Sequence, residues 1–373
     1  MLGFALFKYF PYGGLQRDFL RVARECQRRG YHVRVYTLSW EGPVPEGFDL
    51  VEVPAAALTN HERYRRFGEW VVNDLKHRPV RCLIGFNKMP GLDIYYAADP
   101  CYEEKALRHR SPLYRLTPRY RLFSSFERAV FDARGDVTVL LIAEQQKHQF
   151  QKFYRTPDER LHILPPGISP DRRFSSDSPG IRCEFRREFG LGEDDVLLLL
   201  IGSGFITKGV DRALAAVAAL PEASRERVRL FVIGQDNPRP FLKLADDLGV
   251  AGSLRIFSGR DDVPRFLQGA DLMLHPAYME SGGIVLIEAL VAGLPVVATD
   301  VCGFAPYIVE SGGGVLIESP FEQQRLNEVV ARFVADRTLR TRCAQNGIAF
   351  GRRADVYQMA ERAVDLIESR LNG

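Results

Sequence analysis

Residues 271–299, DLMLHPAYMESGGIVLIEALVAGLPVVAT, decide the fold class of this 373-residue chain. The apolar run over Asp271–His275 predicts a buried strand, and Pro295–Thr299 predicts a second one. Between them, the apolar stretch Gly283–Ala292 has the length and the glycine punctuation of a helix. A strand, a helix and a strand in this order form one parallel βαβ unit. The stretch therefore predicts an α/β fold.

The same alternation of strands and helices continues through the rest of the chain in two blocks. The strands expected in the first block are Leu2–Phe7, His32–Leu38, Leu50–Val53, Cys82–Phe86, Ile94–Ala97 and Val137–Ala143. The further strands expected in the second block are Val196–Gly202, Arg229–Gly234 and Leu254–Phe257. A helix is expected to begin at Lys208. Between the blocks, Leu164–Gly167 and the polar stretch that follows to Gly180 predict an interdomain linker.

A chain of this length suits two domains, because single hydrophobic cores stop growing at a smaller size. We expect two Rossmann-like, doubly wound domains that face a cleft, one over residues 1–165 and one over residues 166–354. A final helix is expected over residues 355–373, and it should pack back on the first domain. The apolar residues on one face of that helix are Val356, Met359, Ala363, Leu366 and Ile367.

The bulk composition is that of an ordinary soluble protein, with 46% hydrophobic residues, 26% charged residues and a net charge of +3. The N-terminal run Leu2–Phe7 lacks the basic start and the cleavage site of a secretory signal. No apolar window is long and uncharged enough to span a bilayer. Six scattered cysteines without a Cys-x-x-Cys pair predict reduced thiols in a cytosolic protein and no zinc site.

Two glycine-rich loops follow expected strands and open a helix. The first, residues 8–14, ends in Gly13 and Gly14, whose N–H groups can approach a phosphate at a helix N-terminus. The second, residues 202–209, carries Lys208, a cation that can neutralise a diphosphate. Neither has the G-x-G-x-x-G spacing of a nicotinamide or flavin site, or the spacing of a P-loop. A plain turn and a solvated lysine are the alternatives.

A third loop places two glutamates on either side of a helix start. Glu280 precedes the helix, and Glu288 lies inside it. The N–H groups of Gly283, Ile284 and Val285 can hold a phosphate between them. A carboxylate can accept two hydroxyl hydrogen bonds from a sugar, so the loop suits a molecule with a sugar, a diphosphate and a ribose. The alternative is that Glu280 is solvated and Glu288 pairs with a nearby base.

These loops resemble those of the retaining family 4 glycosyltransferases of the GT-B fold, through the Glu-x7-Glu spacing, the Gly-Gly loop and Lys208-Gly209. Further segments resemble the lipopolysaccharide core glucosyltransferases of that family: KYFPYGGLQRDF at 8–19, RVYT at 34–37, SWEG at 39–42, GFNKMPGLD at 85–93 and LPPGI at 164–168. The resemblance covers nearly the whole chain. It implies a GT-B fold, a UDP-sugar donor and a heptose of the lipopolysaccharide inner core as acceptor.

The resemblance also implies a role for individual residues on the donor. Gly13 and Gly14 would offer N–H groups to its phosphate and sugar, and Lys208 would bind its diphosphate. Glu280 would hold the hydroxyls of the donor sugar, and Glu288 those of the ribose. One departure concerns the diphosphate: relatives often carry a second basic residue beside the loop lysine, where this chain has Ile206-Thr207.

Two further roles follow from the resemblance, one at each end of the donor. Arg260 would lie near the uracil, and Asp99 would face the reacting carbon.

No Asp-x-Asp motif occurs, so we expect neither a metal nor another cofactor. Asp99, Lys208 and Glu280 are then the candidate catalytic residues. The departing UDP oxygen would deprotonate the acceptor hydroxyl on the same face, which gives retention.

Basic and aromatic residues alternate over residues 105–128. The basic residues are Lys105, Arg108, Arg110, Arg115, Arg119, Arg121 and Arg128. Only Glu127 opposes them, and four aromatic residues lie between them. Such a segment favours an anionic membrane surface, here the cytoplasmic face of the inner membrane, because the acceptor of the resembling family is lipid-anchored. A solvated loop is the alternative, and no nucleic-acid-binding fold accompanies the segment.

Three functions compete on this basis. The first is a retaining glycosyltransferase that moves glucose, or a related hexosamine, to the inner core. The second is another GT-B enzyme, either a UDP-sugar epimerase or a glucan synthase. The third is a non-catalytic scaffold at a membrane surface, and the glycine loops with Lys208, Glu280 and Glu288 argue against it.

Overall fold

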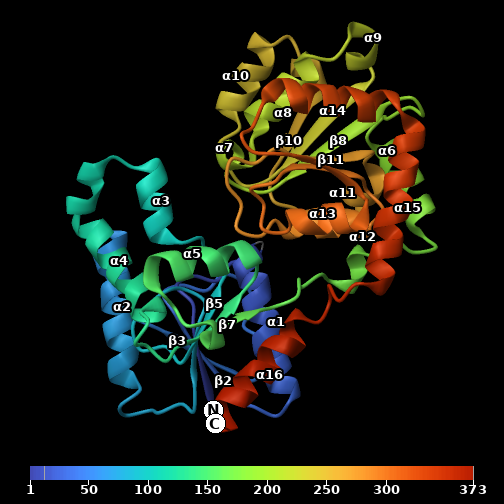
Figure 1. Cartoon of the computed structure of the whole chain (residues 1–373). Coiled ribbons are helices and arrows are strands. Elements are labelled where there is room, and N and C mark those ends of the chain that lie inside the picture. Colours follow the sequence, from blue (N-terminus) through green and yellow to red (C-terminus); the bar gives the residue numbers. More distant parts are fainter. Residues whose placement is uncertain (12, 373) are drawn as a thin grey trace. The chain divides into compact units, whose positions relative to one another are not determined.

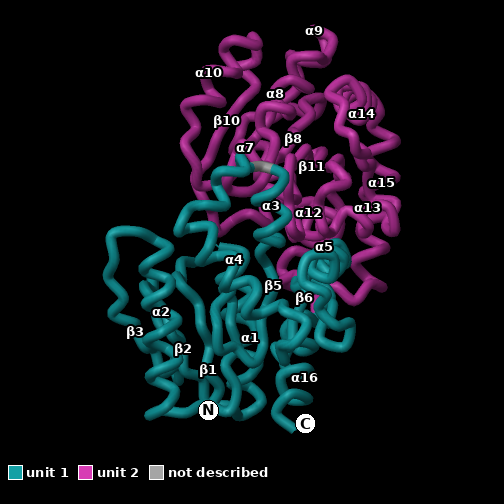
Figure 2. Tube along the Cα trace, turned by 60° about the vertical axis from the view of Figure 1, so that its left-hand side comes forward, with its two compact units in different colours: residues 1–167, 358–373 teal, residues 168–357 magenta. Residues whose placement is uncertain are grey.

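The computed structural model describes residues 1–11 and 13–372, and it divides the chain into two compact units (Figure 2). Unit 1 comprises Met1–Gly167 and Gln358–Gly373, and unit 2 comprises Ile168–Tyr357. Each unit is a parallel sheet with helices on both faces, which confirms two Rossmann-like domains (Figure 1). The division falls after Gly167 and Tyr357, where the sequence placed it after residues 165 and 354.

The described part of unit 1 holds a seven-stranded parallel sheet in the order β3-β2-β1-β4-β5-β6-β7. Its strands are β1 Leu2–Ala5, β2 Val33–Thr37, β3 Phe48–Glu52, β4 Leu83–Gly85, β5 Ile94–Ala97, β6 Thr138–Leu141 and β7 Leu161–Ile163. Its helices are α1 Gly14–Arg28, α2 Asn60–Asp74, α3 Tyr102–His109, α4 Pro118–Phe131, α5 Glu144–Tyr154 and α16 Met359–Asn372, with the 3₁₀ turns η1 Pro112–Leu116 and η2 Asp158–Arg160. The edge strand β7 is missing from the sequence prediction.

Helix α16 packs on α1 in unit 1. Met359, Ala363 and Ile367 are buried in one cluster with strand residues of the sheet. At the rim, Arg29 Nη1 lies 2.8 Å from Asp365 and 2.7 Å from Glu368. Of the expected apolar face, Met359, Ala363, Leu366 and Ile367 therefore pack on this unit. Val356 does not, because α16 begins only at Met359 and Val356 belongs to unit 2.

The described part of unit 2 holds a six-stranded parallel sheet in the order β10-β9-β8-β11-β12-β13. Its strands are β8 Val196–Ile201, β9 Val228–Ile233, β10 Leu254–Phe257, β11 Leu272–His275, β12 Val296–Thr299 and β13 Gly314–Ile317. Its helices are α6 Ser178–Glu188, α7 Phe205–Lys208, α8 Val210–Ala218, α9 Glu222–Arg225, α10 Arg239–Asp247, α11 Val263–Gly269, α12 Ile284–Val291, α13 Ala305–Ser311, α14 Gln323–Ala335 and α15 Arg337–Arg353, with the 3₁₀ turns η3 Pro170–Arg172 and η4 Ala251–Ser253.

Strand β8 runs through the centre of unit 2. Leu198 and Leu200 belong to the hydrophobic layer on one face of the sheet, and Leu197 and Leu199 belong to the layer on the other. All four side chains are fully buried. A strand that is buried on both faces reads as a continuous apolar run, which is why β8 stands out in the sequence.

Two expectations for unit 2 are wrong in detail. The helix expected to begin at Lys208 is α8, and it begins only after Gly209. Lys208 is instead the last residue of the short helix α7. Gly209 has φ +75°, and a Cβ there would lie 2.1 Å from the Pro276 carbonyl oxygen. The polar stretch taken as a linker is also partly ordered, since η3 lies in it and α6 begins at Ser178. Among the described helices, none is both long and apolar enough to cross a membrane.

Candidate functional site

The strand order of unit 2 reverses between β8 and β11 (Figure 1). The connections that leave these two neighbouring strands cross to opposite halves of the sheet. Their loops therefore separate at the carboxyl edge of the sheet. Ligands of doubly wound sheets bind at such switch points. Lys208 lies on the connection that leaves β8, and Glu280 lies on the loop that leaves β11. The fold therefore places both predicted site residues at this edge.

Contacts between the two loops hold Lys208 and Glu280 together. Tyr278 donates its backbone N–H to the Thr207 carbonyl at 2.8 Å. The guanidinium of Arg212 lies 3.5 Å from the ring centres of both Tyr278 and Phe321, and it donates to the carbonyl oxygens of Pro276 and Ala277 at 3.1 Å. Sequence reasoning missed Arg212, because Phe321 is far away in the chain.

Lys208 and Glu280 form an ion pair in which Lys208 Nζ donates to Glu280 Oε2. Their side chains are only 17% and 15% exposed. Burial acts to raise the pKa of Glu280, but the nearby His275 imidazole and the charge of Lys208 outweigh it and lower this pKa to about 2. Glu280 is thus ionised and largely buried, so the alternative of a solvated Glu280 is wrong.

Backbone donors adjoin this pair at the start of α12. Gly283 precedes the helix with φ +87° and has no side chain to cap it. The N–H groups of the first helical turn, from Ile284 and Val285, extend from this end. They carry the partial positive charge that favours a phosphate.

Glu288 lies inside α12 and is 2% exposed. Its Oε1 lies 3.5 Å from Nε of Arg172, which comes from η3. The pairing with a base that the sequence left open is therefore present. The role of Glu288 toward a ribose stays a prediction.

Arg260 follows β10, at the edge of the sheet. Its guanidinium donates to both carboxylate oxygens of Asp262, at 2.6 and 2.8 Å, and these bonds hold the pKa of Asp262 below its usual value. The guanidinium also lies 5.0 Å from the centre of the Phe266 ring. It is fixed in place by these contacts, and its proximity to a uracil stays a prediction.

The predicted residues of unit 1 lie at the carboxyl ends of β1 and β5. Gly13 is the N-cap of α1 and Gly14 its first residue, while Tyr12 of this loop lies outside the described residues. A Cβ on Gly13 would lie 1.8 Å from Gln16 Oε1, so any other residue there would force the Gln16 side chain to move. Asp99 follows β5 with an exposed side chain, and its carbonyl accepts from Gln146 at 3.4 Å.

The position of Glu127 differs from the one expected for the basic segment. Its side chain is fully buried, with Oε1 2.5 Å from Lys88 Nζ and Oε2 2.7 Å from the Tyr154 hydroxyl. The carboxylate also accepts the backbone N–H groups of Tyr102 and Glu103, at 2.8 and 3.0 Å, and so caps α3. Glu127 faces inward, and it does not oppose the basic side chains at the surface.

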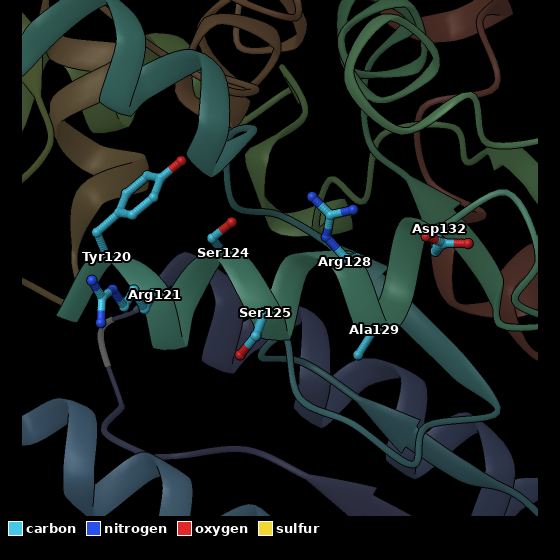
Figure 3. A pocket seen from close by; sticks show the side chains of 7 residues that line it. All are labelled: Tyr120, Arg121, Ser124, Ser125, Arg128, Ala129 and Asp132. Carbon is cyan, nitrogen blue, oxygen red and sulfur yellow. The ribbon is translucent and has the colours of Figure 1, made fainter. Parts of the chain in front are cut away.

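The surface of residues 105–128 combines exposed apolar and stacked basic side chains. Leu113 and Leu116 are 73% and 65% exposed. The guanidinium of Arg119 lies 5.5 Å from the Phe123 ring centre. A groove of about 550 Å³ follows α4 (Figure 3) and is lined by Tyr120, Arg121, Ser124, Ser125, Arg128, Ala129 and Asp132. This surface therefore presents positive charge beside exposed apolar side chains.

Comparison with known proteins identifies similar chains. The model of the family "Glycosyl transferases group 1" matches residues 182–350. The lipopolysaccharide glucosyltransferase WaaG of Escherichia coli (strain K12) is 48% identical over 373 residues, which is 100% of each chain. A crystal structure of WaaG matches with a TM-score of 0.95 over 98% of this chain and 99% of that chain. Anabaena HepE in complex with UDP-glucose shares the fold, at 17% identity, a TM-score of 0.76 and 99% coverage of both chains.

Proposed function

Because this chain belongs to the family of the lipopolysaccharide glucosyltransferase WaaG, within glycosyl transferases group 1, we propose that it moves a hexose from a UDP-sugar to an inner-core heptose. It is a glycosyltransferase of lipopolysaccharide core biosynthesis and has the GT-B fold. Glucose is the proposed donor sugar, as the name of the full-length relative suggests. The observation that carries the donor site is the buried Lys208–Glu280 pair at the β8/β11 switch point.

The donor is proposed to bind with its diphosphate against Lys208 and the first turn of α12. Both offer positive charge at one edge of the sheet, which suits the two negative charges of the diphosphate in a UDP-sugar. Glu280 then accepts hydroxyls of the hexose. Glu288 accepts those of the ribose, and Arg260 lies beside the uracil.

Transfer breaks the bond between the sugar carbon and the UDP oxygen and forms a bond to the acceptor oxygen. The acceptor proton passes to the departing phosphate oxygen on the same face, which retains the configuration. Lys208 and the backbone donors stabilise the charge that develops on the phosphate, and they are in place before the reaction begins. Gly13 and Gly14 contribute further donors in this proposal, and Asp99 orients the acceptor.

The experiment that tests this function incubates the purified chain with radiolabelled UDP-glucose and a lipopolysaccharide core that ends in heptose. We expect label in the lipopolysaccharide through a bond of the same anomeric configuration as the donor. An epimerised UDP-sugar, or a labelled glucan, would instead support another GT-B enzyme. No turnover of any UDP-sugar would support the scaffold.

Transfer is expected to need no divalent metal. Lys208 and the start of α12 can supply the charge that a metal supplies elsewhere. The initial rate should stay within about twofold after dialysis against EDTA, because no step depends on a Lewis acid. A loss of rate that Mg²⁺ or Mn²⁺ restores would contradict this prediction.

We also propose that residues 105–128 bind the chain to the cytoplasmic face of an anionic membrane. The exposed leucines Leu113 and Leu116 can enter the interface while the neighbouring arginines contact phosphates. Arg121 and Arg128 line the groove of α4, and neither forms an ion pair with the described residues. A lipid-anchored acceptor would then reach the enzyme at the membrane surface.

Replacing Arg121 and Arg128 by alanine is expected to weaken binding to phosphatidylglycerol vesicles. Each cation near an anionic surface contributes about 1 kcal/mol, so the double variant should lose about 30-fold in partition coefficient. Co-sedimentation measures the effect. The matched control removes two charges from unit 2, Lys243 and Arg325, and should bind as the unmodified chain does. Binding that is unaffected by salt, or equally weak in both variants, would contradict the proposal.

A further inference from the structure

His275 has an unusual environment for a buried imidazole. It is the last residue of β11, and its side chain is 0% exposed. Among the described residues, neither ring nitrogen has a hydrogen-bond partner of normal geometry. Nε2 nevertheless lies 3.4 Å from Glu280 Oε2. Buried polar groups are nearly always hydrogen-bonded, so an unsatisfied imidazole beside the candidate site calls for an explanation.

His275 and Lys208 approach the same oxygen atom. Lys208 Nζ donates to Oε2 of Glu280, and His275 Nε2 is nearest to that atom too. A carboxylate oxygen has two lone pairs, so both donors can be accommodated on Oε2. Oε1 then remains for a hydroxyl of the donor sugar.

The entry of the donor changes the partner of Glu280. The diphosphate attracts Lys208, which must then divide its hydrogen bonds between the phosphate and the carboxylate. Glu280 is largely buried, and a buried carboxylate that loses its partner is strongly disfavoured. His275 is the neighbouring group that can replace Lys208, because its nitrogens have no other partner to give up.

We propose that His275 is a positioning residue, which holds Glu280 in place for the donor sugar when Lys208 turns to the diphosphate. The inference rests on the proposed function. His275 is buried behind Glu280 and does not itself reach the sugar. It acts by donating Nε2–H to Oε2, which fixes the rotamer of Glu280 and directs Oε1 to a sugar hydroxyl.

Binding of UDP-glucose and of UDP separates this role from a structural one. UDP has no hexose, so its affinity should not depend on Glu280. In calorimetric titrations of the full chain, His275→Leu should lower the affinity for UDP-glucose about 10- to 100-fold. This is the loss expected for one hydrogen bond to a charged group. UDP should bind with an affinity within about threefold of the unmodified chain. His275→Gln retains an amide donor at a similar reach and should restore most of the loss.

The outcomes distinguish the failure of each claim. Equal weakening of UDP and UDP-glucose, or an unchanged affinity for UDP-glucose, would overturn the role of His275. An unmodified chain that binds neither ligand would instead overturn the proposed function. If His275→Leu does not fold, His275→Asn serves in its place. Its side chain is too short to reach Oε2, so it must lose UDP-glucose affinity relative to His275→Gln.

Discussion

Replacing Lys208 by methionine should lower kcat about 100- to 1,000-fold, which is the usual cost of removing one preorganised donor to a developing negative charge. Methionine keeps most of the volume of the lysine side chain and removes its charge. Turnover of UDP-glucose with the heptose-terminated acceptor measures the effect. The exposed Lys243 on α10, which pairs with Asp247 at 2.6 Å, provides the matched control Lys243→Met, and its kcat should not change.

A second variant separates the chemical role of Lys208 from its structural role. Lys208→Met leaves Glu280 buried without its counter-charge, which destabilises the fold as well as the transition state. The double variant Lys208→Met/Glu280→Gln removes both charges, so it should unfold at a higher temperature than Lys208→Met and yet remain inactive. Recovery of activity with stability would mean that Lys208 serves the fold alone.

Replacing Glu127 by alanine should give the largest loss of stability, about 3–5 kcal/mol in the unfolding free energy of unit 1. The substitution leaves Lys88 without its carboxylate partner and removes the cap of α3. Burial alone would raise the pKa of Glu127, but the charge and hydrogen bond of Lys88 and the bonds from Tyr102 and Tyr154 lower it. Glu127 is therefore an anion whose loss cannot be compensated by water.

Urea denaturation followed by tryptophan fluorescence, which reports on unit 1 through Trp40 and Trp70, measures this loss. Glu193→Ala is the matched control, because Glu193 is exposed and lies on a loop of unit 2. The double variant Lys88→Met/Glu127→Leu should recover much of the stability, since an apolar pair can replace a buried ion pair. If Glu127→Ala changes the unfolding free energy by less than about 1 kcal/mol, contacts other than those of Glu127 stabilise α3 and α4.

The sequence predicts the features that depend on local patterns. Strand β8 is visible because both of its faces are buried, and the start of α12 is visible because Gly283 precedes it, with φ +87°. The spacing of Lys208, Glu280 and Glu288 along strand–helix units places them on one domain. Local pattern and fold agree at these positions, so the interpretation from sequence holds.

The sequence does not predict contacts between residues far apart in the chain. Arg212 stacks on Phe321, and Lys88 pairs with Glu127, because the tertiary fold brings helices and strand ends together. Glu127 was counted as a surface charge for this reason. The importance of His275 is hidden as well, since a histidine at the end of an apolar strand has no pattern that reveals its unsatisfied nitrogens.

Calorimetric titration of UDP-glucose into the unmodified chain, Lys208→Met and Lys243→Met tests the donor site at the β8/β11 edge most directly. The unmodified chain and Lys243→Met should bind UDP-glucose with the same affinity. Lys208→Met should bind about 10- to 100-fold more weakly, since it lacks one charge-assisted contact to the diphosphate. Equal affinities for all three chains would contradict the placement of the donor at this edge.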